Sequence, residues 1–273
     1  LGWGGYWSWD PVEIAGLMPW LSGLGLLHCL NTYRSSEQVR RWSYGLIAGT
    51  VLLIIFGIYL SRTGVVTSVH AYSQSSIGPA FMGFFLFLLV ISIGSLAVRW
   101  KELRPASQRP AFLTPAGLTS TLALCLTLLV LVCLLGVTLP LTSQALTGQR
   151  TEPSALYYEW SFGPPLLVIL TSTALGYLPD KKKLRTASVL IALVLVIITG
   201  VLFGKMNFSA LIGLLAVFFL IAALVLTALD RFSHVRSVEK KKRHSPKMAD
   251  IVLHLAFALL ALGVVGSRSL AES

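Results

Sequence analysis

Long apolar stretches alternate with short polar segments along the whole chain. Apolar stretches of about 17 to 25 residues are long enough to cross the hydrocarbon core of a bilayer as helices. Eight such stretches occur, at residues 13–31, 44–61, 80–98, 118–140, 163–179, 186–204, 207–229 and 249–267. The pattern therefore predicts an all-α fold, a polytopic transmembrane helical bundle with eight spans.

Basic residues are concentrated on alternate connecting segments. Eighteen of the 22 Lys and Arg residues fall in the four segments 32–43, 99–117, 180–185 and 230–248. The positive-inside rule places such segments in the cytoplasm or its organellar equivalent. Both termini are then expected on the outer, or P, side of the membrane, together with loops 62–79 and 141–162.

The composition excludes two classes of protein. Only 12% of the 273 residues are charged, 55% are apolar, and the mean hydropathy is +0.77. Disorder requires low hydrophobicity and high charge, and soluble domains carry about 25% charged residues. Neither a disordered protein nor a soluble enzyme is therefore expected. The net charge of +11 reflects topology, and nucleic-acid binding through the basic run 240–243 is not expected, because that run lies in a short loop between spans.

The three cysteines lie within apolar stretches, at Cys29, Cys125 and Cys133, and form no C-x-x-C pair. This spacing argues against a disulfide framework, a zinc site or a thioredoxin-like motif. We expect all three to be packing residues.

The first ten residues combine aromatic side chains with glycines. Trp3, Trp7 and Trp9 with Tyr6 can form a flat apolar surface for a planar ligand, and glycine lets the backbone approach closely. The sequence Asp-Pro-Val-Glu at 10–13 then predicts a helix start, with Asp10 as N-cap and Glu13 as its capping-box partner.

An aromatic belt at the membrane interface is the alternative for these tryptophans. We accept it for three others, Trp20, Trp42 and Trp100. For the cluster at 3–9 both alternatives stay open on composition, although a belt needs no glycines.

Two histidines lie inside apolar spans. His28 is close to the inner end of the first span, and His254 is close to the inner end of the last span. Imidazole is a common axial ligand of haem, and ionisable residues within membranes are usually functional. Hydrogen bonding to neighbouring backbone is the alternative. His234 and His244 lie in a basic loop and are expected to be solvated, and a loop histidine such as His70 is by itself more often an ordinary surface residue.

Two motifs carry a resemblance to a known family. Residues 3–13, Trp-Gly-Gly-Tyr-Trp-Ser-Trp-Asp-Pro-Val-Glu, continuing to Met-Pro-Trp at 18–20, resemble the WWD signature of haem-handling proteins in cytochrome c biogenesis. Residues 61–71, Ser-Arg-Thr-Gly-Val-Val-Thr-Ser-Val-His-Ala, are similar to the CcmF/NrfE haem-lyase branch. The resemblance extends more loosely along the whole chain.

The resemblance implies a division of the chain and a set of binding residues. Residues 1–12 would be an outer WWD haem-docking segment, 13–267 the transmembrane bundle, and 268–273 an outer tail. Substrate haem would lie at the WWD surface, and a buried b-type haem would have two axial histidines. The implied binding residues are Trp3, Trp7, Trp9, Asp10 and His70 for substrate haem, and His28 and His254 for haem b. From their charge and their outer side alone, Arg62 and Arg150 are candidates to pair with the haem propionates.

The resemblance also implies a function and partners. The chain would be a haem lyase component in a bacterial inner membrane or its organellar equivalent, served by a haem chaperone and a thiol-reducing maturation subunit. The substrate protein would be an apocytochrome c with a C-x-x-C-H motif. The family's first outer histidine lies upstream of Leu1, so we expect a central fragment or one piece of a split protein, with separate chains supplying the ends.

Two rival functions remain open on sequence. One is a haem or small-solute transporter. Transporters favour charged or broken helices near the midplane, and the interiors of spans two to seven carry no charge, which counts against this function. The other is a non-catalytic membrane subunit of the maturation complex.

Overall fold

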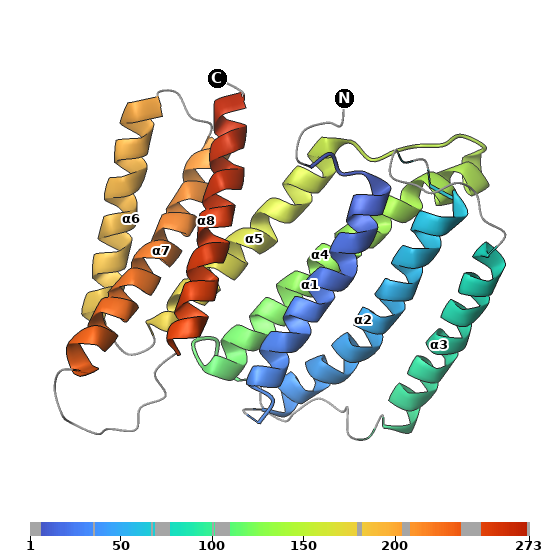
Figure 1. Cartoon of the computed structure of the whole chain (residues 1–273), viewed down its shortest axis with the longest axis horizontal. Coiled ribbons are helices and arrows are strands. Elements are labelled where there is room, and N and C mark those ends of the chain that lie inside the picture. The colour runs from blue at the N-terminus through green and yellow to red at the C-terminus, as the bar shows by residue number, and fades with distance from the viewer. Residues whose placement is uncertain are drawn as a thin grey trace. The chain divides into compact units, whose positions relative to one another are not determined.

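The computed structural model describes residues 7–34, 36–66, 68, 77–99, 101, 110–178, 182–203, 208–235 and 247–271. All regular secondary structure among these residues is α-helical. Each predicted apolar stretch lies on a helix, which confirms the all-α prediction. The helices, labelled in Figure 1, are α1 (Pro11–Asn31), α2 (Glu37–Thr63), α3 (Gly78–Val98), α4 (Pro115–Thr147), α5 (Ala155–Tyr177), α6 (Lys182–Phe203), α7 (Phe208–Val235) and α8 (Met248–Ala271).

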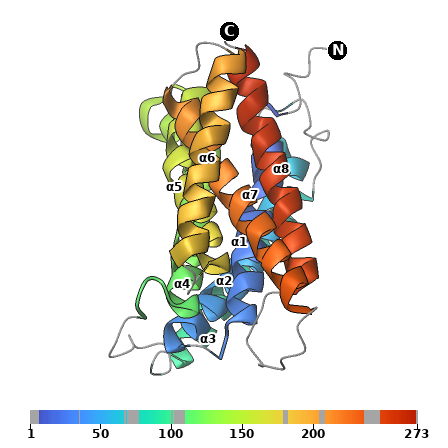
Figure 2. The same cartoon turned by 90° about the vertical axis from the view of Figure 1, so that its left-hand side faces the viewer.

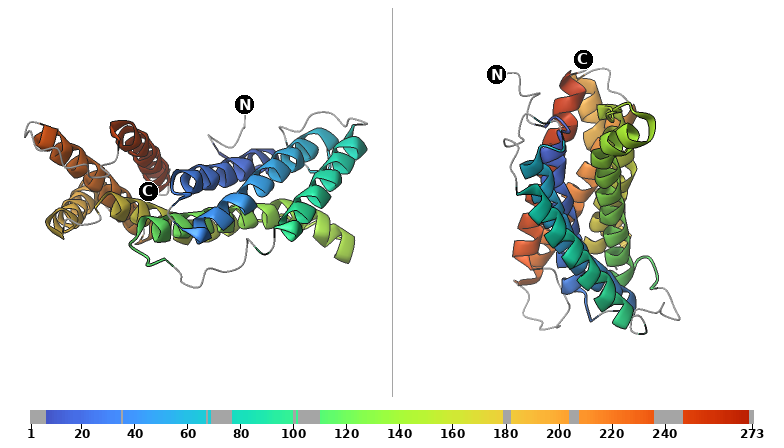
Figure 3. Two further views of the ribbon diagram at one scale, coloured as in Figure 1. Left: turned by 90° about the horizontal axis from the view of Figure 1, so that it is seen from below. Right: turned by 90° about the vertical axis from the view of Figure 1, so that its right-hand side faces the viewer.

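The chain divides into two compact units, residues 1–166 and 167–273. In the first unit α1 packs against both α2 and α4, and α3 packs against α2. Helices α1, α2 and α3 lie side by side in chain order (Figure 3). The core of this unit includes Cys29, Val39, Leu46 and Ala123, so Cys29 is a packing residue as expected.

In the second unit α7 packs against both α6 and α8, as Figure 2 also shows. The last turns of α5 complete its core, where Leu170, Ala174 and Leu178 meet Leu220 and Leu224 of α7. Helix α5 therefore begins in one unit and ends in the other.

Seven of the described helices are long and apolar enough to span a membrane, and α5 is the exception. Its first turns carry Glu159 and Trp160, and Pro164 and Pro165 follow within the helix. The prediction of a helix at 163–179 is thus confirmed. With its charged and proline residues, however, this helix is not among the seven that are long and apolar enough to span a membrane. Exposed apolar side chains on the seven, such as Phe87 and Val90 of α3, fit contact with lipid, and the protein is an integral membrane protein.

The predicted loop 141–162 is mostly helical. Helix α4 continues to Thr147 and α5 begins at Ala155, leaving only residues 148–154 as a connection. Gly148, with φ of 72°, ends α4 in the left-handed conformation that glycine adopts without strain. The prediction of a long outer loop was wrong, because hydropathy alone marks where a helix becomes polar rather than where it stops.

Topology fusions on either side of α5 test whether this helix crosses the membrane. We expect an alkaline phosphatase fusion at Glu152 to be active, and therefore external, and a fusion at Lys182 to be inactive, because a basic segment stays inside. A fluorescent-protein series at the same sites should give the opposite pattern. If both sites report the same side, α5 does not cross, the two termini lie on opposite sides of the membrane, and the expected outer position of one of them is wrong.

Candidate functional site

A capping network fixes the start of α1. The Asp10 carboxylate accepts a hydrogen bond from the backbone N–H of Val12 at 2.8 Å, and Glu13 Oε2 accepts from the backbone N–H groups of Ser8 and Asp10 at 3.1 and 3.4 Å. The predicted capping box is therefore confirmed, with Pro11 in the first turn. This network holds the end of the WWD segment rigidly against the helix.

The same carboxylate reaches the segment that precedes α3. Ser68 Oγ donates a hydrogen bond of 2.6 Å to Asp10 Oδ1, across 58 residues of sequence. Ser68 lies two residues before His70 in motif 61–71. Its place in that motif indicates a site residue, but Ser68 is not among the predicted binding residues. His70 and Trp3 themselves lie outside the described residues.

Trp9 is held against the first turns of α5. Its ring stacks on Tyr158 at 4.6 Å between centroids, with 7° between the planes, and meets Phe162 edge-on at 5.0 Å. Trp7 in turn lies edge-on to Trp9 at 5.6 Å. One face of the Trp9 indole is therefore covered by protein, so Trp7 and Trp9 do not form a single flat shelf.

The backbone of Trp9 is strained. Its φ of 58° lies in the left-handed region, and Trp9 is the one non-glycine residue there among those described. This conformation costs an L-residue roughly 1–2 kcal/mol. Strain of this kind tends to accumulate at functional sites, where the surrounding structure maintains it.

Tyr158 depends on a glycine in the facing helix. A Cβ at Gly136 of α4 would overlap the Tyr158 hydroxyl, and Tyr158 is only 2% exposed. The neighbouring Tyr157 donates a hydrogen bond to the Val132 carbonyl oxygen at 3.0 Å. These contacts fix the start of α5 on α4, so Trp9 has a rigid surface to pack on.

His28 is half-buried near the end of α1. Its Nδ1 lies 2.9 Å from the carbonyl oxygen of Leu24, one turn earlier. A carbonyl oxygen only accepts hydrogen bonds, so this contact favours the tautomer with the proton on Nδ1 and the lone pair on Nε2.

His254 has a similar local arrangement on α8, with one additional partner. Its Nδ1 lies 2.7 Å from the Asp250 carbonyl oxygen and 2.9 Å from the hydroxyl of Tyr177. That hydroxyl also donates to the Asp250 carbonyl at 3.2 Å, and the two rings meet edge-on at 5.4 Å. Tyr177, at the end of α5, was not anticipated from sequence.

The two histidines belong to different compact units, His28 to the first and His254 to the second. Ligation of one haem by both therefore stays a prediction. Their shared local pattern, a ring Nδ1 bonded to the carbonyl four residues earlier, is the arrangement in which iron-ligating histidines are commonly held. The hydrogen bonds to neighbouring backbone that the alternative predicts are therefore present, and the same bonds are compatible with a haem ligand at each position.

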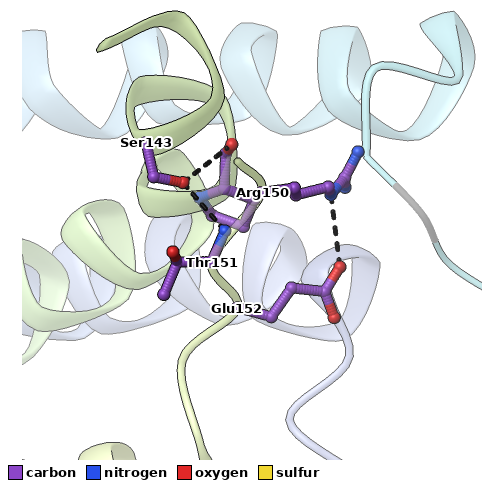
Figure 4. A network of polar contacts seen from close by, with 5 residues as sticks. Ser143, Arg150, Thr151 and Glu152 are labelled. Atoms are coloured by element: carbon purple, nitrogen blue, oxygen red, sulfur yellow. Dashed lines mark hydrogen bonds and ion pairs between the residues drawn. The ribbon is translucent and has the colours of Figure 1, made fainter. Parts of the chain in front are cut away.

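The two outer arginines have different surroundings. Arg62 is exposed in the last turn of α2, before Gly64. Arg150 lies in the connection between α4 and α5, where its Nε donates to Glu152 at 3.3 Å and the N–H of Thr151 donates to Ser143 Oγ at 2.9 Å (Figure 4). Arg150 is therefore already paired with a carboxylate.

No cluster of three or more metal-ligating side chains occurs within the part of the chain that the structure describes. All three cysteines are buried and unpaired.

Comparison with known proteins gives a consistent result. Residues 1–66 match a family model described as cytochrome C assembly protein. Over its whole length the chain is 31% identical to the cytochrome c-type biogenesis protein CcmF of Pseudomonas fluorescens, of which it covers 43%. It is 36% identical over 64% of its length to CycK of Rhizobium meliloti, covering 26% of that protein. It is 32% identical over 76% of its length to the probable biogenesis protein NrfE of Escherichia coli, covering 38% of it.

The chain thus spans less than half the length of these relatives. No solved structure matches it.

The Gly136–Tyr158 contact gives a stability prediction. Gly136→Ala should lower the free energy of unfolding by about 1–3 kcal/mol, the usual cost of overpacking, because the new methyl group overlaps Tyr158. Gly163→Ala in α5 is the matched control, since no atom lies within 4 Å of its added Cβ. Chemical unfolding in detergent measures both variants, and equal midpoints would refute the close contact.

Proposed function

The chain belongs to the CcmF/NrfE group of cytochrome c biogenesis proteins, and we propose that it positions haem for covalent attachment to apocytochrome c. The Asp10–Ser68 hydrogen bond is the observation that carries this proposal. It ties the WWD segment to motif 61–71, which contains His70, so the two motifs of the resemblance would act as one site. Substrate haem would bind there, with His70 as iron ligand and Arg62 pairing with a propionate.

The aromatic residues then have separate roles. Trp9, stacked on Tyr158, anchors the segment to α5. Trp7, half-buried and edge-on to Trp9, would supply a ring for the porphyrin together with Trp3. This division replaces the single shelf expected from the sequence.

A second haem, of b type, would be held by His28 and His254. Bound there, it would supply the electron that keeps the iron of the substrate haem reduced. The protein orients the two ligands through the carbonyl oxygens of Leu24 and Asp250. Tyr177 would fix the His254 ring further, since its hydroxyl touches both Nδ1 and the accepting carbonyl oxygen.

The covalent step places demands on partners. Two cysteine thiols of a C-x-x-C-H motif would add to the two vinyl groups of haem, so each thiol must arrive reduced. A thiol-reducing subunit and a haem chaperone are therefore the proposed partners, and the protein supplies orientation and redox control. Because the chain covers less than half of its relatives, we propose the complete activity for the assembly that contains it.

The two tryptophans should respond differently to substitution. Trp7→Ala should reduce capture of haem from the chaperone and leave the unfolding midpoint unchanged. Trp9→Ala should lower stability by at least the ~0.5–1.5 kcal/mol of an aromatic pair, because it removes the contacts with Tyr158 and Phe162. Haem co-purification and thermal unfolding measure the two effects, and equal loss of stability in both variants would contradict the division of roles.

The buried ligands are tested by spectroscopy of purified variants. His28→Ala and His254→Ala should each lose or loosen the b-type haem in reduced-minus-oxidised spectra, because each removes one axial nitrogen. His28→Gly with added imidazole should partly restore the bands. A colourless wild-type protein, or an unchanged spectrum in either variant, would show that the histidine concerned is not a ligand.

The Tyr177→Phe variant tests whether the Tyr177 hydroxyl orients the His254 ring, while leaving the proposed iron ligand His254 in place. It should retain the b-type spectrum but bind haem roughly tenfold more weakly, the lower end of the effect of losing a partner of a metal-bound histidine. Tyr59→Phe in α2 is the matched control for loss of a tyrosine hydroxyl. If Tyr177→Phe binds haem as tightly as the wild type, Tyr177 has no part in positioning His254.

A further inference from the structure

A groove lies between α2 and α3, away from the residues assigned above. Its volume is about 270 Å³. Its walls are mainly apolar and include Ala48 and Val51 of α2 and Ile91 of α3. These helices contact each other directly and belong to the first compact unit.

One end of this groove is polar and positively charged. Arg99, the C-cap residue of α3, places its guanidinium carbon 5.8 Å from the ring centroid of Tyr44 on α2. Ser95 lines the same end, and the Tyr44 hydroxyl lies 3.3 Å from that of Tyr33. Arg99 and Tyr44 adjoin the basic segments that the positive-inside rule assigns to the cytoplasmic face.

Arg41 of α2 is close to the groove in sequence but does not line it. It precedes Tyr44 by three residues, so the two lie on the same face of α2. Its Nε and Nη2 atoms are buried and donate no hydrogen bond to any part of the chain that the structure describes, and the Glu37 carboxylate is 3.9 Å from Nη2. Arg41 thus forms an ion pair with Glu37 within α2, and the positive charge at the end of the groove comes from Arg99.

We propose that the groove binds an anionic phospholipid of the inner leaflet. An acyl chain would lie along the apolar walls between Ala48 and Ile91, and the phosphate would lie at the polar end near Arg99 and Ser95. A basic pocket between two transmembrane helices on the cytoplasmic side is the usual form of such a site. A soluble anion would not need the apolar walls, and a partner helix would not need the guanidinium group.

The test is native mass spectrometry of the purified chain with phosphatidylglycerol or phosphatidylcholine added. The wild type should retain phosphatidylglycerol in preference to phosphatidylcholine. Arg99→Gln should reduce this retention about tenfold, because it removes a charge-assisted contact. Lys182→Gln, which removes one charge at the exposed start of α6 outside the groove, should have no effect.

A second variant tests the apolar part of the groove. Ala48→Trp leaves every charge in place but fills the space between α2 and α3, so it should abolish lipid retention while gel filtration and helix content stay unchanged. If Arg99→Gln does not fold, Arg99→Lys keeps the charge and should bind with an intermediate affinity.

Four results would overturn the proposal. Equal retention of the two lipids in the wild type would exclude headgroup recognition. Equal loss in Lys182→Gln and Arg99→Gln would indicate general surface charge. Unchanged retention in Ala48→Trp would place the lipid outside the groove. Displacement of the lipid by inorganic phosphate at similar concentration would indicate a soluble-anion site.

Discussion

The outer part of this protein depends on the hydrogen bonds that the carboxylate of Asp10 accepts. This carboxylate caps α1 by accepting a hydrogen bond from the backbone N–H of Val12. It also accepts a hydrogen bond from the hydroxyl of Ser68, in the segment that precedes α3. A charged acceptor at a helix N-terminus also interacts favourably with the helix dipole. One side chain thus sets the direction of α1, the path of the WWD segment and the position of the second motif.

The helices could be predicted from the sequence because each apolar stretch is continuous and the membrane restricts backbone conformation. The ends of α4 and α5 could not be predicted in the same way. Both helices extend beyond their apolar stretches, and Gly148 rather than a change in polarity ends α4. Local stop signals therefore carried information that hydropathy did not contain.

The parts of the candidate site that depend on residues close together in sequence could be predicted. The parts that depend on contacts between residues far apart in sequence could not. The capping box is encoded within four residues, and the structure has it. The contact of Trp9 with Tyr158 spans almost 150 residues, and that of Tyr177 with His254 spans 77. Such pairs arise from helix packing, which a single sequence does not specify, so the covered face of Trp9 was not foreseen.

Position 9 is subject to two preferences that no residue type, Trp included, satisfies together. Its backbone, with φ of 58°, favours glycine or asparagine, while its position against Tyr158 and Phe162 favours a large ring. Glycine would relieve the backbone but lose the ring contacts, and another aromatic would keep the strain with fewer atoms in van der Waals contact. The mutational tolerance of this position is therefore narrow, and local frustration of this kind is retained where a site must hold one conformation.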